Sequence, residues 1–255
     1  MKKLLNAVLL ICLFSGNAFA WGNTGHRVVG HVAQQHLTKK AKREISRILD
    51  CNSLAEVSTW MDNIKSDNAY DHTHDWHWVT IPDGKRYEET DKNPKGDLLA
   101  TIEELTVALK NKNLPAKQQQ ENLKMLVHLI GDLHQPLHVG SGEDQGGNKV
   151  KTDWFGKPSN LHRIWDSDII DHQNLSYTEL AFFLDQPSKD QIRQWQSTTV
   201  RDWAYESMTY RPQVYKLPED KKLGYKYAYE NFETVELRLL QAGVRLAGLL
   251  NAIYG

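Results

Sequence analysis

The chain has 255 residues, of which 40% are hydrophobic, and its 31 lysines and arginines nearly balance its 32 aspartates and glutamates. This composition fits one or two domains with an ample core, and it excludes a basic nucleic-acid coat protein, an acidic tail and a disordered chain. Two cysteines are too few for a disulfide scaffold, so the unusual residues are the 11 histidines and 8 tryptophans.

Residues 1–20 predict a cleaved signal peptide. Two lysines precede an apolar run over residues 4–14, and the small-residue ending AFA at 18–20 fits a cleavage site. The alternative is an uncleaved membrane anchor, but the run is shorter than the roughly 20 residues that a span needs. The lysine pair and the short run are typical of bacteria, so we expect a periplasmic or secreted domain, residues 21–255, that begins at Trp21.

Helical periodicity dominates the rest of the chain. It predicts helices over residues 23–37, 40–49, 53–64, 96–110, 116–134, 160–172, 176–185, 188–208 and 218–253. Residues 71–83 are predicted to be extended and to end in a turn at 82–84, and residues 140–147 form a glycine-rich loop. Alternation over residues 149–155 predicts one strand of a short β-hairpin. Without a repeat or a linker, the simplest architecture is a single all-α, mainly helical domain.

Histidine and aspartate recur at spacings that suit a metal ion. His128 and Asp132 lie four residues apart inside the predicted helix, so both side chains project from one face. His138 follows just past a proline that ends this helix, and His162 and Asp166 repeat the four-residue spacing. One such pair alone is more often a solvated helix face or a simple hydrogen bond. Two pairs together with a further histidine predict a metal site, for which zinc is a suitable ion.

Removal of the signal peptide would add an unusual ligand. The new α-amine of Trp21 would have an ordinary pKa of about 7.7, so it could lose its proton and bind a metal. His26 lies close by in the segment WGNTGH. This observation is weak alone, because many exported proteins begin with an aromatic residue.

Six ordered motifs cover nearly the whole of residues 21–255. They are WGxxGH at 21–26, WxD at 60–62, WHWV at 76–79, HxxGDxHQPLH at 128–138, GGN at 146–148 and NLHxxWD at 160–166. With these motifs the chain resembles the secreted zinc-dependent single-strand-specific nucleases of fungi, the plant bifunctional nucleases and their bacterial relatives. The resemblance implies a fold like that of zinc phospholipase C, with three zinc ions in a cleft.

The resemblance also implies a ligand set for each zinc. The first zinc would be held by Asp62, His77, His128 and Asp132, and the second by His138, His162 and Asp166. The third would take the amine and carbonyl oxygen of Trp21, together with His26 and the second oxygen of Asp132. The remaining histidines are expected at the surface or beside the ligands, and His134, which lies between ligands in the chain, is expected beside them.

The implied activity is hydrolysis of phosphodiester bonds in single-stranded DNA and RNA to products with 5′-phosphates, with 3′-nucleotides as further substrates. Asp62 would orient the attacking nucleophile, and Lys65 would reach the phosphate as charge builds on it. A solvated surface position is the alternative for Lys65, because some family members have an acid there. Trp78 is expected to stack on a base, with a core position as the alternative, and Asn148 to contact a base. We expect a monomer with no protein partner and no membrane attachment.

Two other functions compete with this one. A zinc phospholipase C would share the three zincs, the N-terminal tryptophan and the helical fold, but it uses Glu where this chain has Asp166, and it differs in the GGN loop. An exported zinc-storing protein would close its coordination shells, whereas the ligands expected here, shared among three ions, leave positions for water. The sequence therefore favours the nuclease.

Overall fold

The computed structural model describes residues 21–255, so the predicted signal peptide lies outside the described residues. The described part is mainly helical, as predicted. Its α-helices are α1 (Asn23–Gln35), α2 (Lys39–Ile48), α3 (Leu54–Val57), α4 (Trp60–Asn63), α5 (Leu98–Leu109), α6 (Ala116–His134), α7 (Leu161–Arg163), α8 (Ile169–Asp171), α9 (Tyr177–Leu184), α10 (Lys189–Gln196), α11 (Val200–Thr209), α12 (Arg211–Val214) and α13 (Tyr225–Tyr254). The other helical turns are η1 (Ile64–Ser66), η2 (Asn68–His77), η3 (Tyr87–Glu89), η4 (Pro136–His138) and the π-helix η5 (Ile164–Asp168). The strands are β1 (Val79–Thr80), β2 (Val139–Gly140), β3 (Lys151–Trp154), β4 (Lys157–Asn160) and β5 (Lys222–Leu223).

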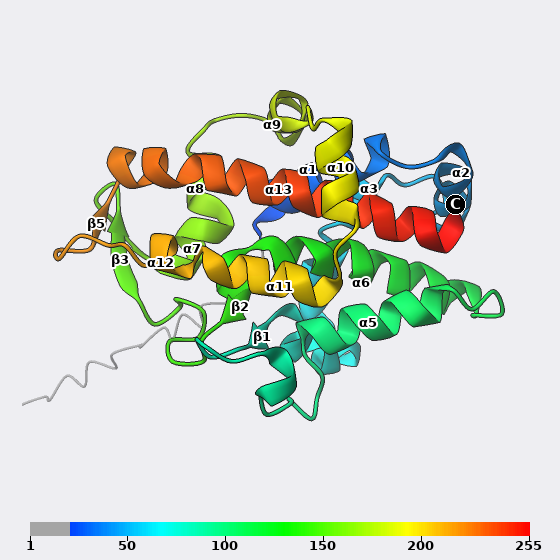
Figure 1. The fold of residues 1–255 in the computed structure, drawn as a ribbon, viewed down its shortest axis with the longest axis horizontal. Helices are drawn as coiled ribbons and strands as arrows, with labels where there is room; N and C mark the ends of the chain where they lie inside the picture. Colours follow the sequence, from blue (N-terminus) through cyan, green and yellow to red (C-terminus); the bar gives the residue numbers. More distant parts are fainter. Residues whose placement is uncertain (1–20) are drawn as a thin grey trace, which may run out of the picture.

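Helix α6 is the central element of the fold. The long helix α13 runs along one side of it, α5 and α11 contact it on other sides, and α1 packs against both α13 and α3 (Figure 1). The bounds predicted for α6 from the sequence match the structure, because Pro115 precedes the helix and Pro136 follows it. Every residue from Met125 to His134 is buried. Polar groups on this half of α6 must therefore find partners inside the protein.

Glycines allow α1 to lie close to its neighbours. A Cβ atom added at Gly243 of α13 would lie 2.6 Å from Val32 of α1. One added at Gly30 of α1 would lie 2.5 Å from the carbonyl oxygen of Leu54 in α3. Only glycine permits both approaches, and the tight packing fixes the position of His26 on the buried face of α1.

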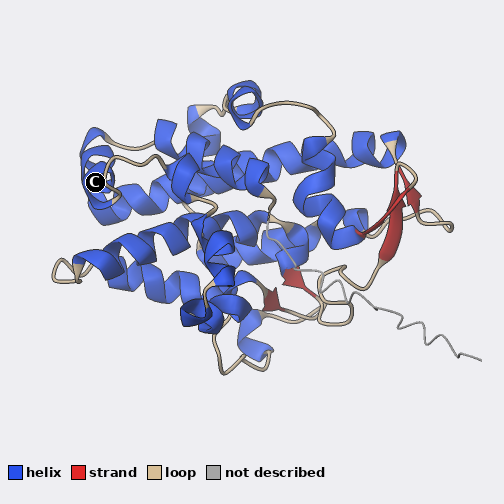
Figure 2. Ribbon diagram, turned by 180° about the vertical axis from the view of Figure 1, so that it is seen from behind, coloured by secondary structure: helices blue, strands red, loops and turns tan. Residues whose placement is uncertain are grey.

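The predicted hairpin is present and lies at one end of the molecule (Figure 2). Strands β3 and β4 pair antiparallel with Trp154 opposite Lys157. The two residues between them, Phe155 and Gly156, have φ angles of 52° and 80°. Two positive φ angles in a row are those of a type I′ turn, the tight connection that suits the twist of a hairpin. Strand β5, which the sequence does not predict, pairs in parallel with β3.

A second pair of strands joins two segments that are far apart in the chain. Strands β1 and β2 pair in parallel with Val79 opposite Val139. The buried guanidinium of Arg211 on α12 donates from Nε to the carbonyl oxygen of Val139 at 2.8 Å and from Nη1 to that of Ile81 at 2.9 Å. It also pairs with Asp83 at 2.8 Å. One side chain therefore ties both strands together.

A buried ionic network supports the C-terminal end of α6. Glu206 on α11 pairs with Arg238 of α13 at 2.8 Å and with Arg245 on the same helix. Arg238 also donates from Nε to the carbonyl oxygen of His134 at 3.1 Å. The last carbonyls of a helix have no partner within it, so this contact satisfies a group that burial would otherwise leave unpaired. It fixes the end of the helix that carries the predicted ligands.

The prediction that residues 71–83 are extended is wrong for residues 71–77. Residues 68–77 form the 3-10 helix η2. Asp67 caps its start, because its carboxylate accepts a hydrogen bond from the amide of Ala69. The hydroxyl of Thr73 donates to the carbonyl oxygen of Tyr70 inside this turn. These short-range bonds replace the extended conformation that the absence of helical periodicity suggested, and they bury His77 at the end of η2.

Four other predicted helices are interrupted or shortened. The one at 53–64 divides into α3, α4 and the start of η1, the one at 160–172 contains the π-helix η5, the one at 188–208 divides into α10 and α11, and the one at 218–253 begins only at Tyr225. The break before α11 has a clear local cause, because the hydroxyl of Thr199 accepts from the amide of Asp202 and so starts a new helix.

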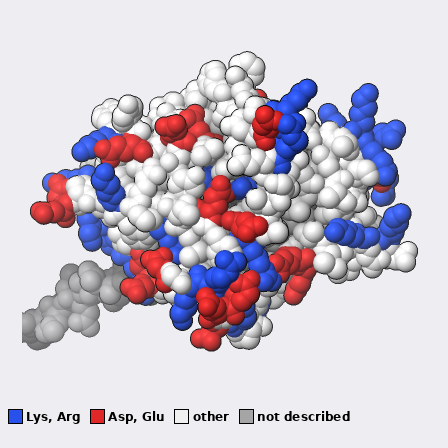
Figure 3. All heavy atoms as spheres, viewed as in Figure 1, with Lys and Arg blue, Asp and Glu red and all other residues white. Residues whose placement is uncertain are grey.

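Charged side chains of both signs are scattered over the face seen in Figure 3, and lysines and arginines gather at the end where α2 lies. Helix α2 itself carries Lys39, Lys40, Lys42, Arg43 and Arg47. Within residues 21–255, no helix is both long enough and apolar enough to cross a lipid bilayer.

Candidate metal centre

Asp132 is the centre of a group of buried side chains. It lies one turn from His128 on α6, while His26 comes from α1 and His77 from the end of η2. Oδ2 of Asp132 is 2.9 Å from Nδ1 of His77 and 3.4 Å from Nε2 of His128, whereas Oδ1 is 3.3 Å from Nε2 of His26. Asp62 on α4 completes the group, with its Oδ1 3.8 Å from Nε2 of His128. The two oxygens of Asp132 thus face different histidines, which suits a carboxylate shared between two ions.

The second group combines a histidine at the end of η4 with side chains of α7 and η5. Nε2 of His162 is 3.1 Å from Oδ2 of Asp166, and Nε2 of His138 is 3.6 Å from Oδ1 of the same carboxylate. Asn160 caps α7 by accepting from the amide of Arg163 at 2.9 Å, and this cap starts the helical turn that projects His162. The side chains that the sequence singles out by spacing are therefore brought together in space.

Backbone carbonyls orient three of the imidazole rings. Nδ1 of His128 donates to the carbonyl oxygen of Ser58 at 2.7 Å, and Nδ1 of His162 to that of Gly146 at 2.6 Å. Nδ1 of His138 is bonded to the carbonyl oxygen of His77 at 2.6 Å, which also joins the two groups. Because the proton of each ring is used at Nδ1, Nε2 presents its lone pair to the group, as in most histidine metal ligands.

Several polar atoms of these side chains are buried and make no hydrogen bond within residues 21–255. They are both ring nitrogens of His26, Nε2 of His77, Nε2 of His138, Nε2 of His162 and Oδ1 of Asp132. An unsatisfied buried polar group costs about 1–3 kcal/mol, so a set of them calls for an additional partner. Two ligand atoms bound at about 2.1 Å to a tetrahedral zinc lie about 3.4 Å apart. The separations here run from 2.9 to 3.8 Å, so this set of nitrogens and carboxylate oxygens fits zinc.

Trp21 is buried against both groups. The amide of Gly22 donates to the carbonyl oxygen of Asp166 at 2.6 Å. A Cβ atom added at Gly131 of α6 would lie 2.8 Å from Nδ1 of His26 and 3.7 Å from the indole of Trp21, so glycine lets both side chains approach α6. The main-chain nitrogen of Trp21 joins the segment outside the described residues, so its role as a ligand after cleavage stays a prediction.

Lys65 lies beside Asp62 and is not a solvated surface residue. Its Nζ is 2.6 Å from Oδ1 of Asp62, and its side chain is only 14% exposed. Burial alone would raise the pKa of Asp62, but the charges of His128 and Lys65 outweigh it and lower the pKa to about 2. Asp62 is therefore ionised at neutral pH.

The electrostatics of the two groups favour a bound cation. Burial and the charge of Lys65 lower the pKa of His77 to about 3, so this ring is neutral, the form that binds a metal. Burial also lowers the pKa of His138, but Asp132 and Asp166 outweigh this and raise it to about 9. These two carboxylates thus favour a positive charge at Nε2 of His138, which a bound metal ion would supply in place of a proton.

A cleft of about 630 Å³ opens beside the second group. Its lining includes the candidate ligands His77, His138 and His162, and also Trp78, Thr80, Gln145, Asn148, Lys149 and Lys151. The side chain of Trp78 is 40% exposed, so the alternative of a core position is wrong. Trp78 and Asn148 are predicted from the sequence, whereas Thr80, Gln145, Lys149 and Lys151 are not. They flank the WHWV and GGN motifs in the chain, which is the signal that would have found them.

His134 does not serve the ligands directly. It is fully buried, as its position between ligands suggested, but its Nδ1 bonds to the carbonyl oxygen of Ile130 at 2.8 Å and its Nε2 lies 3.0 Å from Nη1 of Arg245. Its ring also packs near that of Trp203. Within residues 21–255, the ring of His134 makes no hydrogen bond to a candidate ligand, because it belongs to the ionic network around Glu206.

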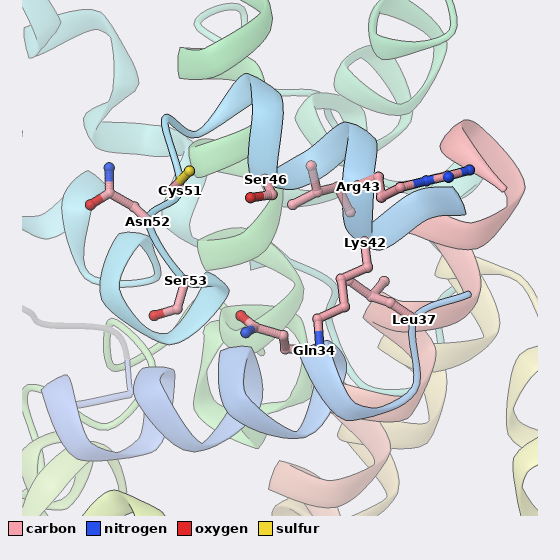
Figure 4. A pocket seen from close by; sticks show the side chains of 9 residues that line it. Gln34, Leu37, Lys42, Arg43, Ser46, Cys51, Asn52 and Ser53 are labelled. Atoms are coloured by element: carbon pink, nitrogen blue, oxygen red, sulfur yellow. The ribbon is translucent and has the colours of Figure 1, made fainter. Parts of the chain in front are cut away.

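Another hollow, of about 430 Å³, lies near α2 at the basic end of the molecule. Figure 4 shows that the side chains of Lys42 and Arg43 point in different directions there, and that Cys51 points away from Gln34. Among the described residues that line this hollow, none is a candidate metal ligand. It lacks the convergent groups that mark the cleft beside His162.

Comparison with known proteins agrees with this geometry. The S1/P1 nuclease family model matches residues 21–255. Endonuclease 2 of Arabidopsis thaliana is 30% identical over 94% of this chain and 92% of its own length. Nuclease S1 of Aspergillus oryzae is 32% identical over 66% of this chain and 61% of its own length, and nuclease P1 of Penicillium citrinum is 27% identical over 92% and 98%. The chain therefore belongs to the S1/P1 nuclease family and is a phosphodiester hydrolase.

Proposed function

We propose that the chain, once residues 1–20 are removed, is an exported zinc-dependent endonuclease. Its substrates would be single-stranded DNA and RNA, cleaved to products that carry 5′-phosphates, and it would also release phosphate from 3′-nucleotides. Residues 21–255 would act as a monomeric domain in the periplasm or outside the cell, without a membrane or a protein partner.

The observation that carries this proposal is the convergence of buried histidines and aspartates, several of whose polar atoms lack hydrogen-bond partners within residues 21–255. Within residues 21–255, three sets have ligand atoms within 4.8 Å of one another, namely His26, Asp62 and His128; His77, His128 and Asp132; and His138, His162 and Asp166. Two of the sets share His128, so they form one connected group, and with the separate third set they support more than one zinc ion. The pairing of His26 with Asp132 that the resemblance implies is also compatible, since these side chains lie 3.3 Å apart.

Zinc bound at these groups would supply Lewis acidity and would lower the pKa of water to about 7. The residues of the chain have separate tasks around it. The ionised carboxylate of Asp62 would accept a hydrogen bond from the nucleophile and orient it toward phosphorus. The ammonium of Lys65, held beside Asp62, would donate to a phosphate oxygen as negative charge builds there.

The exposure of Trp78 supports a preference for single strands. A base must leave its stack before it can lie on the indole, and each such contact contributes about 1–3 kcal/mol. A base inside a duplex is already covered on both faces. Asn148 lies in the same cleft and donates from Nδ2 to the carbonyl oxygen of Gln145 at 2.9 Å, so its Oδ1 would accept from the edge of a base.

Metal ions also explain how a near-neutral chain would attract a polyanion. The side chains of the whole chain sum to a formal net charge of −1, which gives no general attraction for nucleic acid. Divalent ions in the cleft would supply a local positive field that composition does not reveal.

The proposal is tested on correctly processed protein that begins at Trp21. We expect three zinc ions per chain by mass spectrometry. Denatured DNA and RNA should release acid-soluble nucleotides at least about tenfold faster than duplex DNA, and a 3′-nucleotide should release phosphate. EDTA should abolish these activities, and added zinc should restore them.

Other outcomes would replace the proposal with a stated alternative. Equal rates on denatured and duplex DNA would remove the single-strand preference. Hydrolysis of phosphatidylcholine vesicles without any action on DNA would indicate a phospholipase. Three bound zincs without activity on any of these substrates from pH 5 to 9 would indicate a zinc-storing protein.

A further inference from the structure

Within residues 21–255, the cleft lining contains positively charged side chains but no carboxylate. Apart from the candidate ligand histidines, the charged side chains that line the cleft within residues 21–255 are Lys149 and Lys151. Both are exposed, and no carboxylate is part of the lining. A cleft lined by two cations and one exposed indole matches a ligand that carries both phosphates and bases.

A braced loop carries Lys149 and leads into Lys151, the first residue of β3. The amide of Lys149 donates to the carbonyl oxygen of Asp144 at 3.0 Å, and the ammonium of Lys151 donates to the carbonyl oxygen of Asn148 at 3.3 Å. The carboxylate of Asp144 accepts from the amide of Gly147 at 2.9 Å and from the hydroxyl of Tyr215 at 2.8 Å. Within residues 21–255 neither lysine forms an ion pair with a carboxylate, so both charges remain available to an anion.

Lys151 lies close to the second ligand group. Lys151 on β3 pairs with Asn160 on β4, and Asn160 lies two residues before His162. Directly paired residues of antiparallel strands have Cα atoms about 4.5–5.5 Å apart, so Lys151 lies beside the ligand group without belonging to it. Lys149 lines the same cleft as His162. A phosphate bound by the two lysines would be a neighbour of the one that is cleaved.

We propose that Lys149 and Lys151 bind backbone phosphates that flank the scissile phosphate, and that they make the cleft prefer a polynucleotide to a mononucleotide. This inference rests on the proposed function, because it concerns the same cleft. A lysine binds phosphate as a point charge without selecting a base, so the contacts would strengthen binding of any sequence. They act in the ground state as well as during cleavage, so they would affect KM more than kcat.

The experiment compares Lys149→Ala, Lys151→Ala and the double variant with the wild type, all loaded with zinc. Lys157→Ala is the matched control, because Lys157 is exposed on the same hairpin but does not line the cleft. For a 12-residue single-stranded oligonucleotide, each substitution should raise KM about two- to fivefold, with kcat within twofold. The slope of log affinity against log salt should fall by about 0.7 for each lysine removed. A 3′-mononucleotide, which has no flanking phosphate, should keep its KM in all variants.

A binding measurement separates this inference from the proposed function. Fluorescence anisotropy with a labelled phosphorothioate oligonucleotide reports affinity whether or not the protein cleaves. If the wild type cleaves no nucleic acid but the lysine variants bind more weakly, the proposed function fails and the inference stands. If the double variant keeps both KM and affinity within twofold of the wild type, the inference is wrong. An equal rise of KM for oligonucleotide and mononucleotide would also overturn it, because it would place the effect at the scissile phosphate.

Discussion

The ammonium of Lys65 lies 2.6 Å from Oδ1 of Asp62, so a cation and a carboxylate meet at the edge of the first ligand group. Both side chains are largely buried, at 14% and 5% exposed. This pairing helps to keep Asp62 ionised, and it holds the ammonium close to where a bound phosphate would lie.

Lys65→Ala should therefore impair turnover more than metal binding. We expect kcat on single-stranded DNA to fall by about 10- to 100-fold, because a donor to the developing charge is lost. Zinc content, measured by mass spectrometry, should stay the same. Lys85→Ala, at an exposed position, serves as the control and should be neutral. Wild-type kcat in Lys65→Ala would assign this lysine a structural role only.

An extension at the N-terminus tests the predicted role of Trp21. Trp21 is fully buried beside Asp166 and Gly131, so there is little room for altered packing there. A methionine retained ahead of Trp21 would convert its amine to an amide, which is a poor zinc ligand at neutral pH. We expect one zinc fewer per chain and loss of most activity, while a tag after Gly255 should have no effect. Full zinc content in the extended protein would exclude the amine as a ligand.

Removal of the exposed indole tests the base-stacking role of Trp78. Trp78→Ala should raise KM for single-stranded oligonucleotides about 5- to 100-fold, the equivalent of about 1–3 kcal/mol for one stacked base. Trp78→Phe should retain most of the affinity. Phe182→Ala provides the comparison, because Phe182 is 74% exposed on α9 and does not line the cleft. A KM for Trp78→Ala that matches the Phe182→Ala value would exclude stacking.

The buried network predicts how stability depends on pH. Burial alone would raise the pKa of Glu206, but Arg238 and Arg245 outweigh it, so the pKa is lowered. A carboxyl whose pKa is lower in the folded state stabilises the fold above its unfolded pKa of about 4.3, and this stabilisation disappears as pH falls through the folded pKa. Glu206→Gln should thus lower the free energy of unfolding by about 3 kcal/mol at pH 7.

The measurement is urea unfolding of the wild type and Glu206→Gln between pH 7 and pH 3, with the same zinc content in both proteins. The difference between the two proteins should shrink toward the acid end. Glu44→Gln removes an exposed ion pair with Arg47, and it should change stability by less than about 1 kcal/mol. A difference for Glu206→Gln that stays constant over this range would contradict the lowered pKa.

The sequence predicts α6 and its ligands well because every local signal agrees there. Pro115 and Pro136 bound the helix, and the spacing of His128 and Asp132 needs only helical geometry to bring the two together. The parts played by residues of α1, α4 and η2 could be expected only from the resemblance. No local pattern links elements that meet through tertiary packing.

The features that the sequence did not predict depend on such packing. Helix η2 lacks the 3.6-residue period, so its segment looked extended, yet it buries His77. No local pattern in the sequence indicates that Arg238 and Arg245 are buried, yet both are, and both pair with Glu206 of α11. Lys151 looked like an ordinary strand residue until the fold placed it on the wall of the cleft.

A residue that does not line the cleft holds part of its wall in place. Arg211 lies on α12, yet its guanidinium holds the carbonyl oxygens of Val139 and Ile81, and so it joins the two strands that form part of the wall. The strands cannot separate without breaking buried, charge-assisted hydrogen bonds. We therefore expect this side of the cleft to be rigid, so that binding of a substrate would lose little free energy to its ordering. A nucleic-acid substrate would then have to adapt its own shape, and a single strand bends more easily than a duplex.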